Sequence, residues 1–257
     1  MPLSADQKKR TDVAESHGYL PTYRSIVRDM CACFWWHGRD EFGNYRILQN
    51  GTVCFVNTGS ELIAVTAAHV LEGYISAKRQ NPDIICQLGS ITYDPENHVI
   101  DIDSRLDLAT FRVSPVVVAG SDCSPSTTTS WPPVSVATGD ILLCGGHPGA
   151  IRHENESTAD LPFQWFLASA ASSNENIALS LELDDCYVPL TGEPLSNQAL
   201  GGMSGGPVFK YIPPSPIERI ELVGFIYEFQ PAYGLMFARP AMYIDNQGRI
   251  NAARRLG

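Results

Sequence analysis

The chain has 257 residues, of which 44% are hydrophobic and 18% are charged, as expected of a globular protein with a substantial core. Its formal net charge of −10 argues against nucleic-acid binding, which usually needs a basic surface. No apolar run reaches the length of about 18 residues that a membrane span needs, and the polar N-terminus "MPLSADQKKRTD" lacks the apolar centre of a signal peptide. We therefore expect no nucleic-acid partner and no membrane partner.

Residues 1–30 are the most helix-like part of the chain, and we interpret them as an N-terminal extension in which Pro21 interrupts a helix. Residues 31–120 are predicted to form a first β domain. Within it, "GTVCFV" and "LIAVTAAHV" flank the turn sequence "NTGS" and predict a hairpin. The segments "ICQLGSITYD", "HVIDIDS" and "DLATFRVSPVVV" continue the pattern of short strands.

Residues 121–133 belong to a stretch rich in Ser, Thr and Pro, which makes them the best candidate for a linker. Residues 134–257 contain a second series of strand-like segments, namely "GDILLCGGHPG", "FQWFLASAAS", "NIALSLEL", "GGPVFKY", "IELVGFIYEF" and "GLMFARP". Many short strands separated by turns are typical of β-barrels or of a sandwich. Two β blocks of similar size on either side of a linker fit two small barrels.

The seven cysteines are an odd number, so at least one stays unpaired within the chain. Most of them lie in apolar, strand-like surroundings, which favours buried free thiols in a reducing, cytoplasmic compartment. Cys31 and Cys33 with His37 resemble half of a zinc site, but no second matching pair follows. We therefore expect no metal.

The sequence "QALGGMSGGPVF" places Ser204 between two pairs of glycines, immediately before an apolar strand. One interpretation is a flexible turn between strands. The other is a nucleophile held in a tight bend, with backbone N–H groups facing a substrate. The second interpretation requires a general base and an orienting acid elsewhere in the chain.

His69 and Asp107 are the best candidates for this base and this acid. His69 ends the apolar run "LIAVTAAH", where the small Ala67 and Ala68 leave room for it to point into a cleft. The alternative is a hydrogen-bonded core histidine. Asp107 begins the alternating segment "DLATFRV", and a buried carboxylate there needs a partner such as an imidazole N–H. The alternative for Asp107 is the cap of a turn.

Together the three residues have complementary chemistry. A serine hydroxyl attacks effectively only when a general base takes its proton. Histidine suits that task because its pKa lies near neutral pH, and a carboxylate fixes the tautomer of the ring and stabilises the imidazolium. His69, Asp107 and Ser204 follow the chain order of the chymotrypsin type, which differs from the order in other serine-hydrolase folds.

The motifs "TAAHV", "DLATF" and "GMSGGPVF" resemble those of the trypsin-like (chymotrypsin-fold) serine peptidases, and "GDILLCGGHPG" is similar to the start of the second barrel in bacterial trypsin-like and HtrA-type peptidases. The resemblance covers about residues 45–240. It implies an all-β fold of two six-stranded antiparallel β-barrels with the active site between them. By motif match, His69 would be the general base, Asp107 its orienting acid and Ser204 the nucleophile. The backbone N–H groups of Gly202 and Ser204 would form the oxyanion hole.

The sequence also departs from this family. Secreted members join a cysteine directly after the catalytic histidine to an earlier one, but here Cys54 occupies the earlier position and Val70 the later. Secreted members also carry an aspartate before the serine that pairs with a new N-terminus on activation, and Met203 replaces it. Tyr227 stands where those members have a serine that supports the catalytic aspartate. No PDZ domain, which HtrA-type members usually add, is expected.

The resemblance assigns the primary substrate pocket approximately to Gln198, Tyr227, Glu228, Phe229 and Gly234. No aspartate stands at the base of this pocket, so a preference for Lys or Arg is not supported there, although Glu228 would attract a basic side chain from the rim. Phe229 would narrow the entrance, which favours a small or medium apolar residue at the cleavage site. In the alternative interpretation, Tyr227 and Phe229 are barrel core.

The expected function is a cytoplasmic serine endopeptidase that hydrolyses protein or peptide substrates through a covalent acyl-enzyme, without a metal or an organic cofactor. Two alternatives stay open. One is a pseudo-peptidase that acts as a binding module. The other is a latent peptidase whose oxyanion loop is ordered by a regulatory protein partner.

Overall fold

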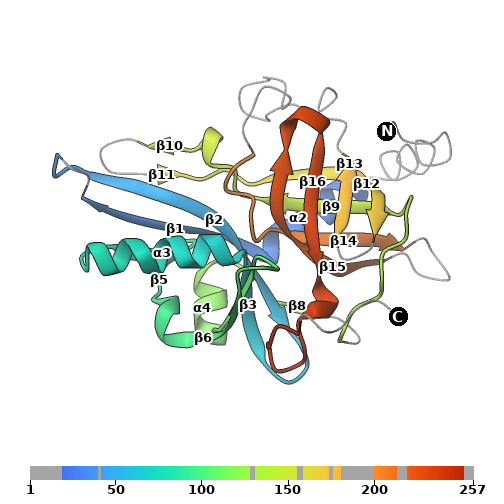
Figure 1. Ribbon diagram of the computed structural model, residues 1–257, viewed down its shortest axis with the longest axis horizontal. Helices are drawn as coiled ribbons and strands as arrows, with labels where there is room; N and C mark the ends of the chain where they lie inside the picture. The colour runs from blue at the N-terminus through green and yellow to red at the C-terminus, as the bar shows by residue number, and fades with distance from the viewer. Residues whose placement is uncertain are drawn as a thin grey trace.

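The structure is a computed structural model that describes residues 19–39, 42–127, 131–154, 159–173, 176–180, 200–212 and 219–251 (Figure 1). The helices are α2 (Tyr19–Asp29), α3 (Ala68–Gln80) and α4 (Pro115–Gly120), with short 3-10 turns η1 (Pro95–His98), η2 (Gly149–Ile151), η5 (Pro231–Tyr233) and η6 (Ala241–Tyr243). The strands are β1 (Cys31–Arg39), β2 (Tyr45–Asn57), β3 (Leu62–Thr66), β4 (Ile85–Leu88), β5 (Ile91–Thr92), β6 (Val99–Asp103), β7 (Leu108–Arg112), β8 (Ser126–Thr127), β9 (Ile141–Gly146), β10 (His153–Glu154), β11 (Ala159–Asp160), β12 (Gln164–Ser173), β13 (Ile177–Ser180), β14 (Pro207–Ile212), β15 (Arg219–Gln230) and β16 (Leu235–Pro240). Strands dominate, which confirms the prediction of a mostly β fold.

The strands β1 to β8 form one sheet, with the order β5-β4-β1-β2-β3-β7-β6 and with β8 paired in parallel to β2. The expected closed barrel is not confirmed here, because β5 and β6 are not joined by hydrogen bonds. β5 is only two residues long, and the turn η1 follows it, with Pro95 in its first turn and Asp94 as its cap. Proline lacks a backbone N–H and cannot extend a ladder at this point, so the sheet stays open between β5 and β6.

The second half of the chain forms the expected closed antiparallel barrel, with the strand order β12-β13-β16-β15-β14-β9. Side chains of alternate strand positions point inward and fill a barrel of this size. The buried interior includes Leu142, Phe166, Leu179, Val223 and Met236. One of the two predicted barrels is therefore confirmed, within residues 134–257.

Three local expectations are wrong, each close to the start of a helix. Pro21 lies in the first turn of α2, where its missing N–H costs no intrahelical hydrogen bond, so it does not interrupt the helix. The segment after Ser114 forms α4 instead of a strand, because the Ser114 hydroxyl accepts from the N–H of Val117 and Pro115 opens the helix. His69 lies in the first turn of α3, since β3 has already ended.

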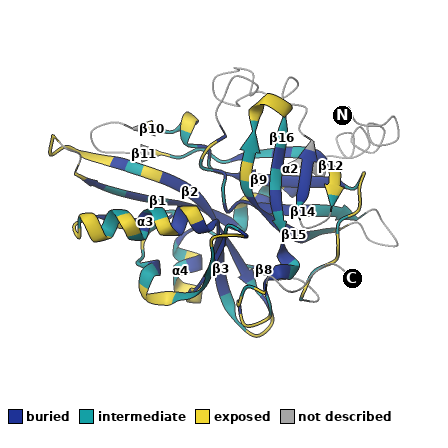
Figure 2. Ribbon diagram, in the orientation of Figure 1, coloured by how far each residue is buried: buried dark blue, intermediate teal, exposed yellow. Residues whose placement is uncertain are grey.

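A separate apolar cluster joins the open sheet to the barrel. It combines Tyr23 and Val27 of α2, Val56, Ile63 and Val65 of the sheet, and Leu143, Phe209, Leu222 and Phe225 of the barrel. Figure 2 shows the buried parts of both halves meeting near the centre of the molecule. Burial of each such side chain contributes about 1.5–3 kcal/mol. This packing fixes the sheet relative to the barrel, so residues from both are held in register at their boundary.

Those of the predicted linker residues that the structure describes pack against both β blocks. β8 pairs with β2, and Trp131 Nε1 donates to the carbonyl oxygen of Ile244 over 2.8 Å. Cys123 Sγ lies 3.4 Å from the carbonyl oxygen of Cys31 in β1. The segment between the two β blocks is thus anchored at several points.

Six cysteines lie in the part of the chain that the structure describes, and all are free thiols: Cys31, Cys33, Cys54, Cys86, Cys123 and Cys144. Cys186 lies outside the described residues. No group of three or more His, Cys, Asp or Glu side chains in the described ranges is arranged to hold a metal ion. None of the described helices has the length and apolar character needed to cross a membrane.

Candidate active site

The pairing of β3 with β7 brings His69 and Asp107 to one edge of the first sheet. The two strands are antiparallel, with Thr66 opposite Ala109. His69 follows the end of β3 and Asp107 precedes the start of β7. The topology therefore places two residues that are far apart in the sequence on neighbouring chain segments.

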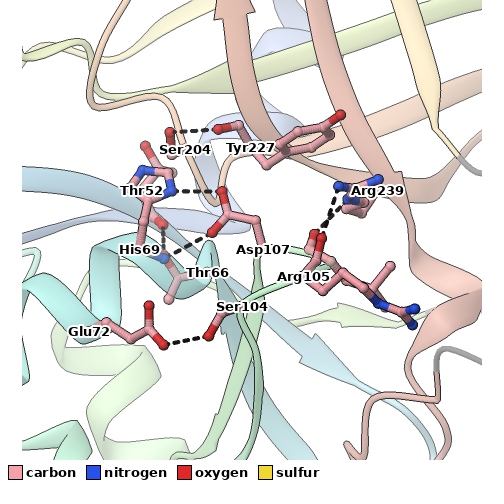
Figure 3. A network of polar contacts seen from close by, with 11 residues as sticks. Thr52, Thr66, His69, Glu72, Ser104, Arg105, Asp107, Ser204, Tyr227 and Arg239 are labelled. Atoms are coloured by element: carbon pink, nitrogen blue, oxygen red, sulfur yellow. Dashed lines mark hydrogen bonds and ion pairs between the residues drawn. The ribbon is translucent and has the colours of Figure 1, made fainter.

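Asp107 holds His69 through two hydrogen bonds (Figure 3). The ring nitrogen Nδ1 of His69 lies 2.7 Å from Asp107 Oδ2, and the backbone N–H of His69 donates to Asp107 Oδ1 over 2.9 Å. Because an ionised carboxylate only accepts, Nδ1 carries the proton, and the neutral ring keeps a lone pair on Nε2. The side chain of His69 is 50% exposed and that of Asp107 only 20%. An accessible ring with a sheltered orienting acid is what a general base requires.

These surroundings raise the pKa of His69 above its ordinary value of 6.5. The hydrogen bond with Asp107 is the largest cause, burial acts in the opposite direction, and the negative charges of Asp107 and Glu72 add to the increase. The Glu72 carboxylate is itself held by the hydroxyl of Ser104 over 2.7 Å. As the pH falls, His69 therefore loses its neutral, proton-accepting form at a higher pH than a free histidine does.

Replacement of Glu72 by glutamine is expected to lower the pKa of His69, because the amide removes a negative charge that favours the imidazolium. The neutral form of His69 would then persist to lower pH. The measurement is an NMR titration of the His69 ring signals, which needs no substrate. Glu96→Gln is the matched control, since Glu96 pairs with Lys78 and Arg79. An equal pKa of His69 in the wild type and in Glu72→Gln would show that the charge of Glu72 does not raise the pKa of His69.

Ser204 lies in the loop that leads into β14. Its hydroxyl donates to the carbonyl oxygen of Tyr227 over 3.3 Å and forms no hydrogen bond with His69 in this structure. Figure 3 shows Ser204, His69 and Asp107 grouped together, with Ser204 coming from the barrel half and the other two from the first sheet. The three residues predicted from separate motifs are thus brought together at the boundary between the two halves.

The peptide group between Gly201 and Gly202 is oriented by Gly149. The N–H of Gly149 donates to the carbonyl oxygen of Gly201 over 2.7 Å. Since the C=O and N–H of a trans peptide point in opposite directions, the N–H of Gly202 points away from Gly149. Neither this N–H nor that of Ser204 donates a hydrogen bond to any other residue in the described ranges. Two unused donors next to a serine hydroxyl suit an oxyanion hole.

The two glycines directly after Ser204 are required because neighbouring backbone atoms leave no room for side chains. A Cβ atom at Gly205 would lie 1.9 Å from the carbonyl oxygen of Thr52, and one at Gly206 would lie 2.1 Å from that of Gly145. Gly205 also has a φ of +93°, which residues with a side chain rarely adopt. The glycine pattern therefore reflects close backbone packing, which favours the tight-bend interpretation over a flexible turn.

Thr52 of β2 ties the first sheet to the serine loop (residues 200–206), and sequence reasoning missed it. Its N–H donates to the Ser204 carbonyl over 2.9 Å, and its hydroxyl donates to the Gly202 carbonyl over 2.8 Å. The hydroxyl also accepts from the N–H of His147 over 2.9 Å. No local motif marks Thr52, because all these partners lie far away in the chain.

No model of a known protein family matches this chain. A search among curated proteins also returns no match. The function of the site is therefore inferred from its own geometry and from the motifs that build it.

Of the predicted pocket residues, Gln198 lies outside the described residues. Glu228 is exposed, and its carboxylate accepts from Gln230 Nε2 over 2.9 Å. Phe229 is partly buried and packs against the barrel core, which agrees with the alternative interpretation given to it above. Gly234 ends the turn η5 with a φ of 59°. These side chains do not by themselves define a closed specificity pocket.

Tyr227 has a different setting, because it is the extra residue of a β-bulge between β15 and β16. Ile226 pairs with Ala238, while Glu228 pairs with the next residue, Phe237. A bulge changes the direction of the side chain that it carries. The Tyr227 ring lies against the guanidinium of Arg239, with 4.1 Å between the carbon atom Cζ and the ring centre.

Proposed function

We propose that the protein is a serine endopeptidase of the trypsin-like type, with Ser204 as nucleophile, His69 as general base and Asp107 as orienting acid. The observation that carries the proposal is the pairing of Asp107 with both the ring and the backbone N–H of His69, at 2.7 and 2.9 Å, in one group with a serine on a glycine-lined bend. In this proposal the open sheet corresponds to the first barrel of that family and the closed barrel to the second.

The proposed reaction begins when His69 Nε2 takes the proton of Ser204 Oγ as that oxygen attacks a peptide carbonyl. The Ser204 hydroxyl must first turn from Tyr227 toward His69, and such hydrogen bonds often tighten only when substrate binds. The N–H groups of Gly202 and Ser204 stabilise the oxyanion. Protonated His69 then gives its proton to the leaving amine, and Ser204 retains the acyl group as an ester. Water, deprotonated by His69, attacks the ester. The bond from Ser204 Oγ to the acyl carbon then breaks, the carboxylic acid product leaves, and His69 returns its proton to Ser204 Oγ.

One edge of β15 beside Ser204 suits the binding of an extended peptide. β14 pairs with β15 only as far as Phe225, opposite Pro207. Beyond that point one edge of β15 still pairs with β16. On the opposite edge, beside Ser204, the Tyr227 carbonyl accepts from the Ser204 hydroxyl. We propose that the substrate adds to this opposite edge as an antiparallel strand, a common mode of peptide recognition. The preference for a small or medium apolar residue at the cleavage site stays a prediction.

A latent peptidase is the second candidate, and one observation favours it. In this structure the Ser204 hydroxyl is directed to the Tyr227 carbonyl and not to His69. Activity would then require a partner or a substrate that turns the hydroxyl. The unused N–H groups of Gly202 and Ser204 favour the constitutive enzyme, because a collapsed oxyanion loop would use them internally.

The cysteines support a reducing compartment, and we propose the cytoplasm. The six described thiols are free, and burial raises the pKa of Cys33 and of Cys54. A thiol with a raised pKa carries little thiolate and reacts slowly. Such cysteines behave as small apolar core residues.

Reaction with a fluorescent fluorophosphonate tests the proposed function directly. This reagent phosphonylates a serine oxygen only where a base and an oxyanion site activate it, so we expect one label, which peptide mapping would locate on Ser204. Heat-denatured protein is the control for unspecific labelling. If the folded protein is not labelled, either alone or with peptide substrates added, the proposal of a serine peptidase is contradicted. Labelling only after a partner or a peptide is added would favour the latent peptidase.

A further inference from the structure

Arg239 of β16 holds the backbone that leads into Asp107. Its Nε donates to the carbonyl oxygen of Leu106 over 2.5 Å, and Nη2 reaches that of Arg105 over 3.4 Å. Nη1 donates to the side-chain oxygen of Asn176, and the Tyr227 ring covers the guanidinium plane. The barrel thus forms hydrogen bonds with the segment of the first sheet that carries the proposed orienting acid (Figure 3).

Among the described residues, the Asp107 carboxylate accepts hydrogen bonds only from His69, the residue that it would orient. No hydroxyl from β15 reaches it, because Tyr227 occupies the place where the resemblance implied a serine, and its ring lies on Arg239 instead. The direction of the Asp107 side chain must therefore be set by its backbone.

That backbone is held in an uncommon conformation. Asp107 has a φ of 53°, in the left-handed region that costs a residue with a side chain about 1 kcal/mol or more. On one side, the N–H groups of Arg105 and Leu106 donate to the Asp103 carboxylate, each over 2.9 Å. On the other side, Arg239 binds the carbonyl oxygens of the same two residues. A strained conformation persists only where its surroundings determine it this fully.

We propose that Arg239 is a positioning residue, which locks the peptide between Leu106 and Asp107 so that the Asp107 carboxylate meets both N–H groups of His69. The inference rests on the proposed function, in which Asp107 orients the general base. Arginine suits the task because its planar fork can bind two carbonyl oxygens while an aromatic ring covers its face. Lysine offers a single ammonium group and cannot satisfy all of these contacts.

The test compares Arg239→Met, Arg239→Lys and Asp107→Asn with the wild type. Methionine keeps an apolar stem beside Tyr227 but donates no hydrogen bond. Asp107 and Glu72 are the charged groups that act on His69, so a displaced Asp107 would lower the pKa of His69. We expect Arg239→Met to shift this pKa toward that of Asp107→Asn, and to lower kcat by about 10²-fold with little change in KM. Arg239→Lys should fall between Arg239→Met and the wild type in both measurements.

A purely structural role for Arg239 would change the unfolding temperature without moving the pKa of His69. Arg219→Met is the matched control, because Arg219 pairs with Glu221 at the far end of β15. If Arg239→Met does not fold, Arg239→Lys decides. A pKa of His69 that equals the wild-type value in the folded Arg239 variants would overturn the proposal. This NMR reading needs no turnover, so it stays informative even if Ser204 fails to react with a fluorophosphonate.

Discussion

Replacement of Ser204 by alanine is expected to abolish peptide-bond hydrolysis while leaving the fold intact. The proposed acyl-enzyme cannot form without the hydroxyl, and loss of the nucleophile costs about 10⁶-fold in kcat in serine peptidases. The hydroxyl makes one hydrogen bond, at the long distance of 3.3 Å, so its loss should change the free energy of unfolding by less than about 1 kcal/mol. The backbone contact of Ser204 with Thr52 does not depend on the side chain.

The measurement combines hydrolysis of a peptide library with thermal unfolding of wild type and Ser204→Ala. Ser90→Ala is the matched control, since it removes one exposed hydroxyl that donates to the Gly120 carbonyl over 2.9 Å, away from the site. The control should keep wild-type activity. Hydrolysis by Ser204→Ala at a rate within tenfold of the wild type would rule out Ser204 as nucleophile.

The three candidate residues were predictable because each lies in a short motif with its own chemical logic. Asp107 stands out as an acid at the start of an apolar strand, and Ser204 as a hydroxyl among glycines. Thr52 and Arg239 have no such signal. Their partners lie 150 and 133 residues away, and only the packing of the sheet against the barrel brings them into contact.

The fold was predictable where strand periodicity is strong and was missed where capping decides. The apolar segment after Ser114 has the residues of a strand, yet a serine cap and a proline start a helix. The helical position of His69 was hidden for a different reason: α3 has no side-chain cap, and the mostly apolar "LIAVTAAHV" gives no sign of where the strand ends. The first sheet stays open at β5, and this strand of two residues is too short to leave a periodic pattern in the sequence.

Replacement of Gly205 by alanine is expected to disrupt the serine loop itself. The new Cβ atom would lie 1.9 Å from the Thr52 carbonyl oxygen and 2.9 Å from the Cα atom of Thr66, both backbone atoms of the first sheet. Alanine must also adopt a φ of +93°. Overpacking and backbone strain each cost about 1–3 kcal/mol, so we expect a loss of stability of about 2–6 kcal/mol. Any folded fraction should lose activity by about 10²-fold or more, since small displacements of a nucleophile are costly.

Chemical denaturation and fluorophosphonate labelling of the same samples measure the two effects. Gly201→Ala is the matched control for stability, because a Cβ atom at Gly201 meets no atom within 4 Å. Its free energy of unfolding should stay within about 0.5 kcal/mol of the wild type. If Gly205→Ala were as stable and as readily labelled as the wild type, the loop would not be held between the two halves by close backbone contact. The glycines would then mark a flexible turn, and the geometry on which the oxyanion site depends would lose its support.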